Sequence, residues 1–241
     1  MVYFEEYIKD ANLAKTPNEL FDIFINNVSQ YGFDKVLFAL ITDHKDVNLS
    51  AGVGIMQNYP KDWMQYYHEK ELDRVDPILT YGVHQSSAFK WDDIEKHVTL
   101  NSKQKLCLEL GEEAGLNNGI SVPLKGINNQ MAGISLATSE KKDACYLDAD
   151  LITAYCNHFY IAYKRLHEKN DVNPINIVIT KKEKEILTWA AAGKSDDEIA
   201  IILDISKHTV NMHLRNIFSK MEVNNRVLAV VKALSTGLIQ L

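Results

Sequence analysis

The chain has 241 residues, 46% of them apolar and 24% charged, which is typical of a folded globular protein and excludes a disordered or fibrous one. Its formal net charge is −6, which over the whole chain argues against a nucleic-acid partner. No stretch reaches the ~18 consecutive apolar residues of a membrane-spanning helix, and three scattered cysteines without CxxC spacing predict neither disulfides nor a metal site.

The charge is distributed unevenly along the chain. A polar stretch at 166–175 contains an Asn-Pro step, which disfavours a continuing helix and predicts a linker. Residues 1–173 carry 17 Lys+Arg against 25 Asp+Glu, or −8, whereas residues 174–241 carry nine against seven, or +2. We therefore predict two domains, 1–165 and 176–241, and the charge of the second does not exclude DNA. The acidic N-terminus is not a secretory signal, so we expect a cytoplasmic protein.

The N-terminal domain mixes helix and strand patterns. Thr16 and Glu19 are spaced as a capping box around Pro17, and they predict a helix that runs to Ser29. Short apolar runs predict buried strands at 36–42, 119–124 and 132–137, the last two joined by a turn at 126–130. Further helices are expected at 61–69, 77–83, 103–114 and 148–167. This order predicts an α+β fold, with an α-β-α sandwich around a mostly antiparallel sheet.

The C-terminal domain is predicted to be all-α, with four short helices. They follow the N-cap candidates Thr180, Ser195, Ser206 and Asn225. The third helix has an apolar stripe at Val210, Leu214, Ile217 and Met221, opposite a polar stripe at His208, Asn211, Met212, Arg215 and Ser219. Two short helices joined by a tight turn, the second presenting donors, are typical of a helix-turn-helix that reads the major groove.

Two kinds of DNA contact are predicted on this domain. Asn211 and Arg215 are suited to pair with base edges, while four flanking residues are suited to bind phosphates: Lys207, Thr209, Lys220 and Arg226. From the spacing alone, these residues fit a solvated helix face equally well.

A resemblance favours DNA. Residues 179–230 closely resemble the helix-turn-helix domain of LuxR-type transcription factors, which implies DNA binding and base contacts by Asn211 and Arg215. The matching residues are Glu183, Leu187, Trp189, Gly193, Lys194, Glu198, Ile199, Ala200, Ile205, Ser206, Thr209, Val210, His213, Leu214, Lys220, Asn225 and Arg226.

The first 165 residues are then a sensor of either phosphorylation or a small molecule. A phosphoacceptor domain needs an acidic pair after its first strand, but residues 43–46 read Asp-His-Lys-Asp, and the βαβ alternation is absent. Aromatic residues instead cluster between 59 and 91 around Asp76, a composition typical of a ligand pocket.

The spacing within this cluster resembles the acyl-homoserine-lactone-binding domain of LuxR-type regulators. The matching residues are Tyr59, Trp63, Tyr67, Asp76-Pro77, Trp91 and Gly119. The resemblance implies an N-acyl homoserine lactone as ligand. Its chemistry would have Asp76 accept the amide N–H, Trp63 donate to the lactone carbonyl, and Tyr59 and Ser135 donate to the acyl carbonyl. Tyr67 and Trp91 would wall the pocket, and Val36, Phe38, Leu40 and Ile55 are unassigned candidates for the lining of the acyl tail.

Taken singly, these residues have ordinary explanations. Asp76 before Pro77 is also a helix N-cap, Trp63 and Trp91 are also core aromatics, and Ser135 also fits a strand position that faces solvent. Gly119 is expected to permit close packing. A pocket for another metabolite, a ligand-independent module and, more distantly, a lactone hydrolase remain as alternatives. No paired carboxylates, nucleophile–base arrangement or metal-ligand spacing is found, so we expect no catalytic residue, metal or cofactor.

The resemblance also implies partners and a role. We expect a quorum-sensing regulator, an activator of transcription, that binds an inverted-repeat operator as a homodimer and contacts RNA polymerase. The fourth helix is the candidate dimer contact of the DNA-binding domain, through Val227, Val231, Leu234 and Leu238.

Overall fold

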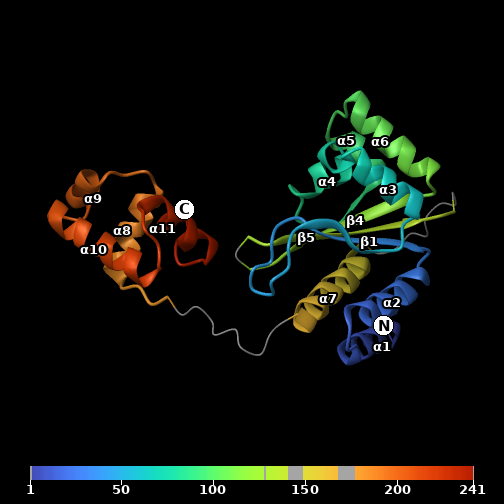
Figure 1. Cartoon of the computed structure of the whole chain (residues 1–241), viewed down its shortest axis with the longest axis horizontal. Helices are drawn as coiled ribbons and strands as arrows, with labels where there is room; N and C mark the ends of the chain where they lie inside the picture. Colours follow the sequence, from blue (N-terminus) through green and yellow to red (C-terminus); the bar gives the residue numbers. More distant parts are fainter. Residues whose placement is uncertain (1, 128, 141–148, 168–176, 241) are drawn as a thin grey trace. The chain divides into compact units, whose positions relative to one another are not determined.

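The computed structural model describes residues 2–127, 129–140, 149–167 and 177–240 (Figure 1). The chain forms two compact units, one before and one after the end of helix α7. The expected linker, 166–175, lies outside the described residues except for its first two positions. In the described part of the chain, no helix has the length and apolar character needed to span a bilayer.

The larger unit is built on a five-stranded antiparallel sheet, and the sequence predicted the antiparallel arrangement and three of the strands. Its strands follow the order β2-β1-β5-β4-β3. They are β1 (Lys35–Leu40), β2 (Gly52–Gln57), β3 (Phe89–Lys90), β4 (Asn117–Lys125) and β5 (Met131–Thr138). The β4–β5 hairpin and β1 were predicted from apolar runs. The two edge strands were not, because β2 contains two glycines and is only partly buried, and β3 has only two residues.

Helices cover both faces of this sheet, which confirms the predicted α-β-α sandwich (Figure 1). One face packs on α1 (Val2–Leu13), α2 (Pro17–Ser29) and α7 (Ala149–His167) through a core that includes Phe24, Phe38, Tyr155 and Phe159. The other face carries α3 (Lys61–Glu69), η1 (Leu72–Arg74), α4 (Pro77–Gly82), η2 (Trp91–Asp93), α5 (Ile94–His97) and α6 (Ser102–Glu113). Thr16 caps α2 as predicted, accepting the backbone N–H of Glu19.

The smaller unit is the predicted set of four helices. They are α8 (Lys181–Ala191), α9 (Asp196–Ile202), α10 (Lys207–Lys220) and α11 (Arg226–Ser235). Each begins at its predicted cap, because the side chain of Thr180, Ser195, Ser206 or Asn225 accepts a backbone N–H of the first turn. The predicted apolar stripe of α10 is buried and meets α8, α9 and α11 in one core.

Candidate functional site

A cavity of about 450 Å³ lies in the larger unit, between the sheet and the helices α3 to α6. All six residues predicted to contact a ligand line it: Tyr59, Trp63, Tyr67, Asp76, Trp91 and Ser135. The first five come from α3, α4, η2 and the segment before α3, and Ser135 comes from β5. The fold therefore gathers residues 76 positions apart around one space, although their roles toward a ligand stay predictions.

Asp76 is a capping residue and a cavity residue at the same time. Its Oδ1 accepts the backbone N–H of Ile78 at 2.8 Å, which caps α4, and its Oδ2 accepts the hydroxyl of Tyr67 at 2.8 Å. Burial raises the pKa of Asp76, because the charged carboxylate loses hydration, although these hydrogen bonds act in the opposite direction. Asp76 thus caps α4 and also places its carboxyl group at the cavity wall.

Two donors in the cavity have no hydrogen-bond partner among the described residues. The hydroxyl of Tyr59 is buried and unpaired among the described residues, and burial raises its pKa, so it stays a protonated donor. The indole N–H of Trp63 has no hydrogen-bond partner in the described part of the chain either. Buried polar groups in folded proteins are nearly always paired, so an unpaired hydroxyl here indicates a place for an external acceptor.

Trp91 and Ser135 are joined by a residue that the sequence reasoning missed. The indole N–H of Trp91 donates to Ser121 Oγ at 2.9 Å, and Ser121 Oγ lies 2.7 Å from Ser135 Oγ. A Cβ on Gly119 would come within 2.0 Å of the Trp91 ring, so the predicted close packing at this glycine is confirmed. Ser121 lies directly opposite Ser135 in the β4–β5 pairing. Only the register of the two strands could have predicted this contact.

The expected lining of the acyl tail was wrong. Val36, Phe38 and Leu40 point to the opposite face of the sheet, into the core with α2 and α7, and Ile55 is an exposed residue of the edge strand β2. Successive side chains of a strand alternate between faces, and residues 36–41 are all apolar, so the run does not reveal which set faces the cavity. The structure places Leu37 there, and a second cavity of about 40 Å³ continues the apolar lining through Ala39, Ile41, Phe89 and Met131.

In the smaller unit, α9 and α10 form the predicted helix-turn-helix. The turn between them includes Asp204, whose φ of 51° is left-handed. On α10 the polar stripe is accessible: His208, Met212, Arg215 and Ser219 are exposed, and Asn211 is half-buried. Asn211 and Arg215 therefore lie one turn apart on the face available to DNA.

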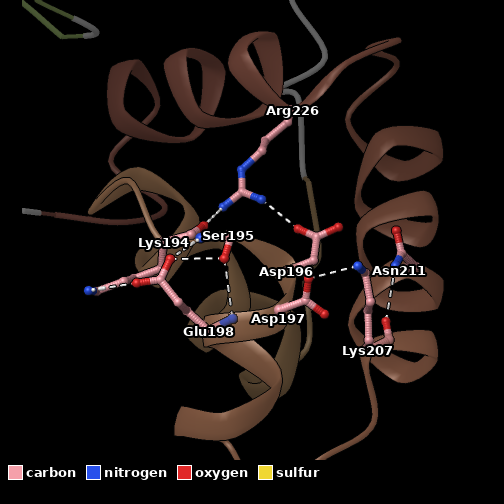
Figure 2. A network of polar contacts seen from close by, with 8 residues as sticks. All are labelled: Lys194, Ser195, Asp196, Asp197, Glu198, Lys207, Asn211 and Arg226. Atoms are coloured by element: carbon pink, nitrogen blue, oxygen red, sulfur yellow. Dashed lines mark hydrogen bonds and ion pairs between the residues drawn. The ribbon is translucent and has the colours of Figure 1, made fainter.

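Three of the four residues predicted to bind phosphates are held in ion pairs. Figure 2 shows the pairs of Lys207 and Arg226. Lys207 Nζ lies 2.7 Å from Asp197 Oδ2, on the first turn of α9. Arg226 contacts Asp196 Oδ1 at 2.5 Å and also donates to the carbonyl oxygen of Lys194. These contacts fasten α9 to α10 and α11, so both cations have a structural role inside the unit besides the predicted one.

Lys220 has the most buried partner. Its ammonium lies 2.7 Å from Oε2 of Glu183, a residue only 2% exposed that also completes the capping box of α8. Burial acts to raise the pKa of Glu183, but the Lys220 ammonium and the N–H of Thr180 hold it below its ordinary value. The fourth predicted phosphate contact, Thr209, is half-buried and bonded to the N-cap Ser206.

The family is shown by two matches that follow the two units. Residues 16–160 match the model of the autoinducer binding domain, and residues 178–233 match that of bacterial regulatory proteins of the luxR family. The chain belongs to the LuxR family of autoinducer-binding, DNA-binding regulators. The first match spans the cavity and the second spans the helix-turn-helix.

Individual relatives agree with this family. The transcriptional activator protein LuxR of Aliivibrio fischeri is 35% identical over 209 residues, covering 84% of this chain and 81% of LuxR. The quorum-sensing regulator RhlR of Pseudomonas aeruginosa is 28% identical over 222 residues, covering 91% and 89% of the two chains. These relatives are transcriptional regulators, not enzymes.

Among solved structures, the fold is similar to that of SdiA from Escherichia coli. One crystal structure of SdiA has a TM-score of 0.62 at 26% identity, covering 98% of this chain and 99% of SdiA. A second, of SdiA in complex with octanoyl-rac-glycerol, has the same TM-score at 25% identity and covers 99% and 97% of the two chains.

Proposed function

We propose that this LuxR-family chain is a quorum-sensing receptor for an N-acyl homoserine lactone, and that its ligand occupies the cavity around Asp76. The observation that carries the proposal is a set of three polar groups at the cavity: the Tyr59 hydroxyl and the Trp63 indole N–H, which are unpaired among the described residues, and the Asp76 carboxylate. A lactone supplies one complementary partner for each.

The proposed pose follows from donor and acceptor chemistry. Asp76 accepts the ligand's amide N–H in a charge-assisted bond, and Trp63 donates to the lactone carbonyl. Tyr59 and Ser135 donate to the acyl carbonyl. The acyl tail then extends past Leu37 toward the second, apolar cavity, which shares Leu37, Ile78, Leu79 and Ser135 with the first.

On the DNA side, we propose that the chain acts in the cytoplasm as a homodimer on an inverted repeat and activates transcription through RNA polymerase. Support for a dimer comes from α11, where Val227 is 70% exposed and Val231 is 56% exposed. Leu234 and Leu238 instead pack partly against the core of the unit, so they serve that core first. A dimer would present two copies of α10 about one turn of the DNA double helix apart.

A second candidate ligand is a medium-chain monoacylglycerol. SdiA has been solved with octanoyl-rac-glycerol, and the apolar extension of the cavity would accept the same kind of tail. A glycerol ester has no amide N–H, so its hydroxyls would have to donate to Asp76 instead.

Calorimetric titration of the full-length chain separates the two candidates. The titrants are N-acyl homoserine lactones of graded chain length, and 1-octanoyl glycerol. The proposal expects at least one lactone to bind more tightly than the glycerol ester and to raise the affinity for an inverted-repeat DNA. Tighter binding of the ester, or no lactone binding at all, would contradict it.

A further inference from the structure

We infer that Ser121 is a positioning residue that fixes the direction of a hydrogen-bond chain, Trp91 to Ser121 to Ser135, so that Ser135 presents a hydrogen to the cavity. The inference rests on the proposed ligand and deepens it, because it names the residue that orients the Ser135 hydroxyl toward the ligand. The ligand atom that Ser135 meets is a hydrogen-bond acceptor, the oxygen of an acyl carbonyl.

The chain begins at Trp91, whose direction is chemically fixed. An indole nitrogen carries one hydrogen and has no lone pair to offer, so at 2.9 Å it can only donate to Ser121 Oγ. The indole is itself held in place because its ring lies against Gly119, where no Cβ intervenes.

The direction of the second hydrogen bond, from Ser121 to Ser135, follows by elimination. Ser121 is 6% exposed, and its hydroxyl has one hydrogen to donate. Its neighbour at hydrogen-bond distance is Ser135 Oγ, 2.7 Å away. If Ser135 donated instead, the buried Ser121 hydroxyl would receive two hydrogens and leave its own unpaired, which is costly.

Ser135 is left with a free hydrogen. Its Oγ accepts from Ser121, and it has no other hydrogen-bond partner in the part of the chain that the structure describes. Ser135 is half-buried and lines both cavities, at the place where the head of the ligand meets the tail. A chain of hydrogen bonds in a site of low dielectric also strengthens its last donor.

A double-mutant cycle on the full-length chain tests this arrangement, with N-octanoyl-L-homoserine lactone and its longer and shorter homologues as titrants. Ser135→Ala should weaken binding about tenfold, and Ser121→Ala about threefold. The double variant should bind no more weakly than Ser135→Ala alone, because Ser121 acts only through Ser135. Ser121→Thr should restore affinity, since it keeps the hydroxyl and its methyl group can enter the second cavity that Ser121 lines.

Ser29→Ala is the matched control. Its hydroxyl bonds a backbone carbonyl on α2, on the other face of the sheet, so affinity should stay within about twofold of wild type. Losses that multiply in the double variant, or no loss in Ser121→Ala while the wild-type chain binds, would overturn the relay and leave the proposed ligand standing. A wild-type chain that binds none of the lactones would overturn the ligand, and with it the acceptor assigned to Ser135.

Discussion

In the ligand cavity the buried hydroxyl of Tyr59 has no partner among the described residues, whereas on the DNA-binding helices the ammonium of Lys207 is already paired with Asp197. A ligand acceptor can therefore pair with the Tyr59 hydroxyl without displacing an internal partner. Lys207, Lys220 and Arg226 must instead exchange a carboxylate partner for a phosphate. We expect high affinity from a single well-matched ligand at the first site and weak binding per unit at the second.

This contrast gives a physical reason for dimeric binding. The smaller unit carries only +2, and its first helix turn in the helix-turn-helix carries Asp196, Asp197 and Glu198. Non-specific DNA affinity comes mainly from cations that replace counterions on phosphates, so a unit that pairs its own cations binds weakly alone. When two units are joined in one dimer, the second unit binds at a high effective concentration, so the dimer binds far more tightly than either unit alone.

The largest effect is expected from Asp76→Asn in the cavity. Asparagine keeps the N-cap of α4 but loses the charge-assisted bond, so lactone affinity should fall by about 1.5–3 kcal/mol, or about 10- to 150-fold in calorimetric titration. Asp73→Asn removes the same charge at an exposed position three residues earlier and should leave affinity unchanged. Equal binding by wild type and Asp76→Asn would remove Asp76 from the site.

The same titrations carry a pH dependence. The ionised carboxylate accepts the ligand's N–H, so binding lowers the pKa of Asp76, which burial raises above 3.8 in the free protein. Lactone affinity should therefore fall as the pH decreases through that raised pKa. The stability of the free protein depends on pH with the opposite sign. Because the pKa of Asp76 is higher in the folded than in the unfolded state, its contribution to the free energy of unfolding is lost as the pH rises through the folded-state pKa. Asp76→Asn should flatten both profiles.

On the DNA-binding face, the next largest effect is expected from Arg215→Ala. Removing an exposed arginine that reads a base should weaken the binding free energy for the operator by about 1–3 kcal/mol and relax the preference for one base pair. Gel-shift titrations against single-base operator variants measure this. An equal loss on every sequence would make Arg215 a phosphate contact.

Lys220→Ala should act through stability. Removing the ammonium leaves the buried carboxylate of Glu183 without its partner, and we expect the unfolding free energy of the smaller unit to fall by about 1–2 kcal/mol, less than for a fully buried pair because Lys220 is 39% exposed. Hydrogen exchange of α8 and α10 in the full chain reports this loss. Lys182→Ala breaks the exposed pair with Glu185 and is the control. Unchanged exchange with weaker DNA binding would restore Lys220 as a pure phosphate contact.

The smallest effect, and the one with the opposite sign, is expected from Asp197→Asn. Freeing Lys207 from its exposed partner should raise DNA affinity about 1.5- to 5-fold and steepen the salt dependence by about one counterion. Glu185→Gln makes the same change of charge in a pair on α8. If both variants bind alike, net charge and not the Lys207 pair sets the affinity.

The sequence predicted the features that short-range chemistry decides. Cap residues such as Thr16 and Ser195 placed helix starts correctly, and the apolar stripe of α10 placed its core face. Trp63 and Asp76, which the resemblance to LuxR-type regulators singled out, both line the cavity.

What the sequence missed depends on contacts between distant residues. Lys220 pairs with Glu183, 37 positions away, and Ser121 lies opposite Ser135 on the neighbouring strand. Neither contact exists until the helices and strands are packed. The side of the sheet that Leu37 faces could not be predicted from the sequence, because residues 36–41 are all apolar.

Thermal unfolding of Tyr59→Phe, with and without lactone, tests most directly whether the unpaired hydroxyl of Tyr59 binds the ligand. Removing an unpaired buried hydroxyl should leave the Tm of the free protein unchanged or raise it by about 2–4 °C, while the rise in Tm caused by lactone becomes smaller. A lower Tm for the free variant together with an undiminished lactone shift would show that the hydroxyl serves the fold and not the ligand.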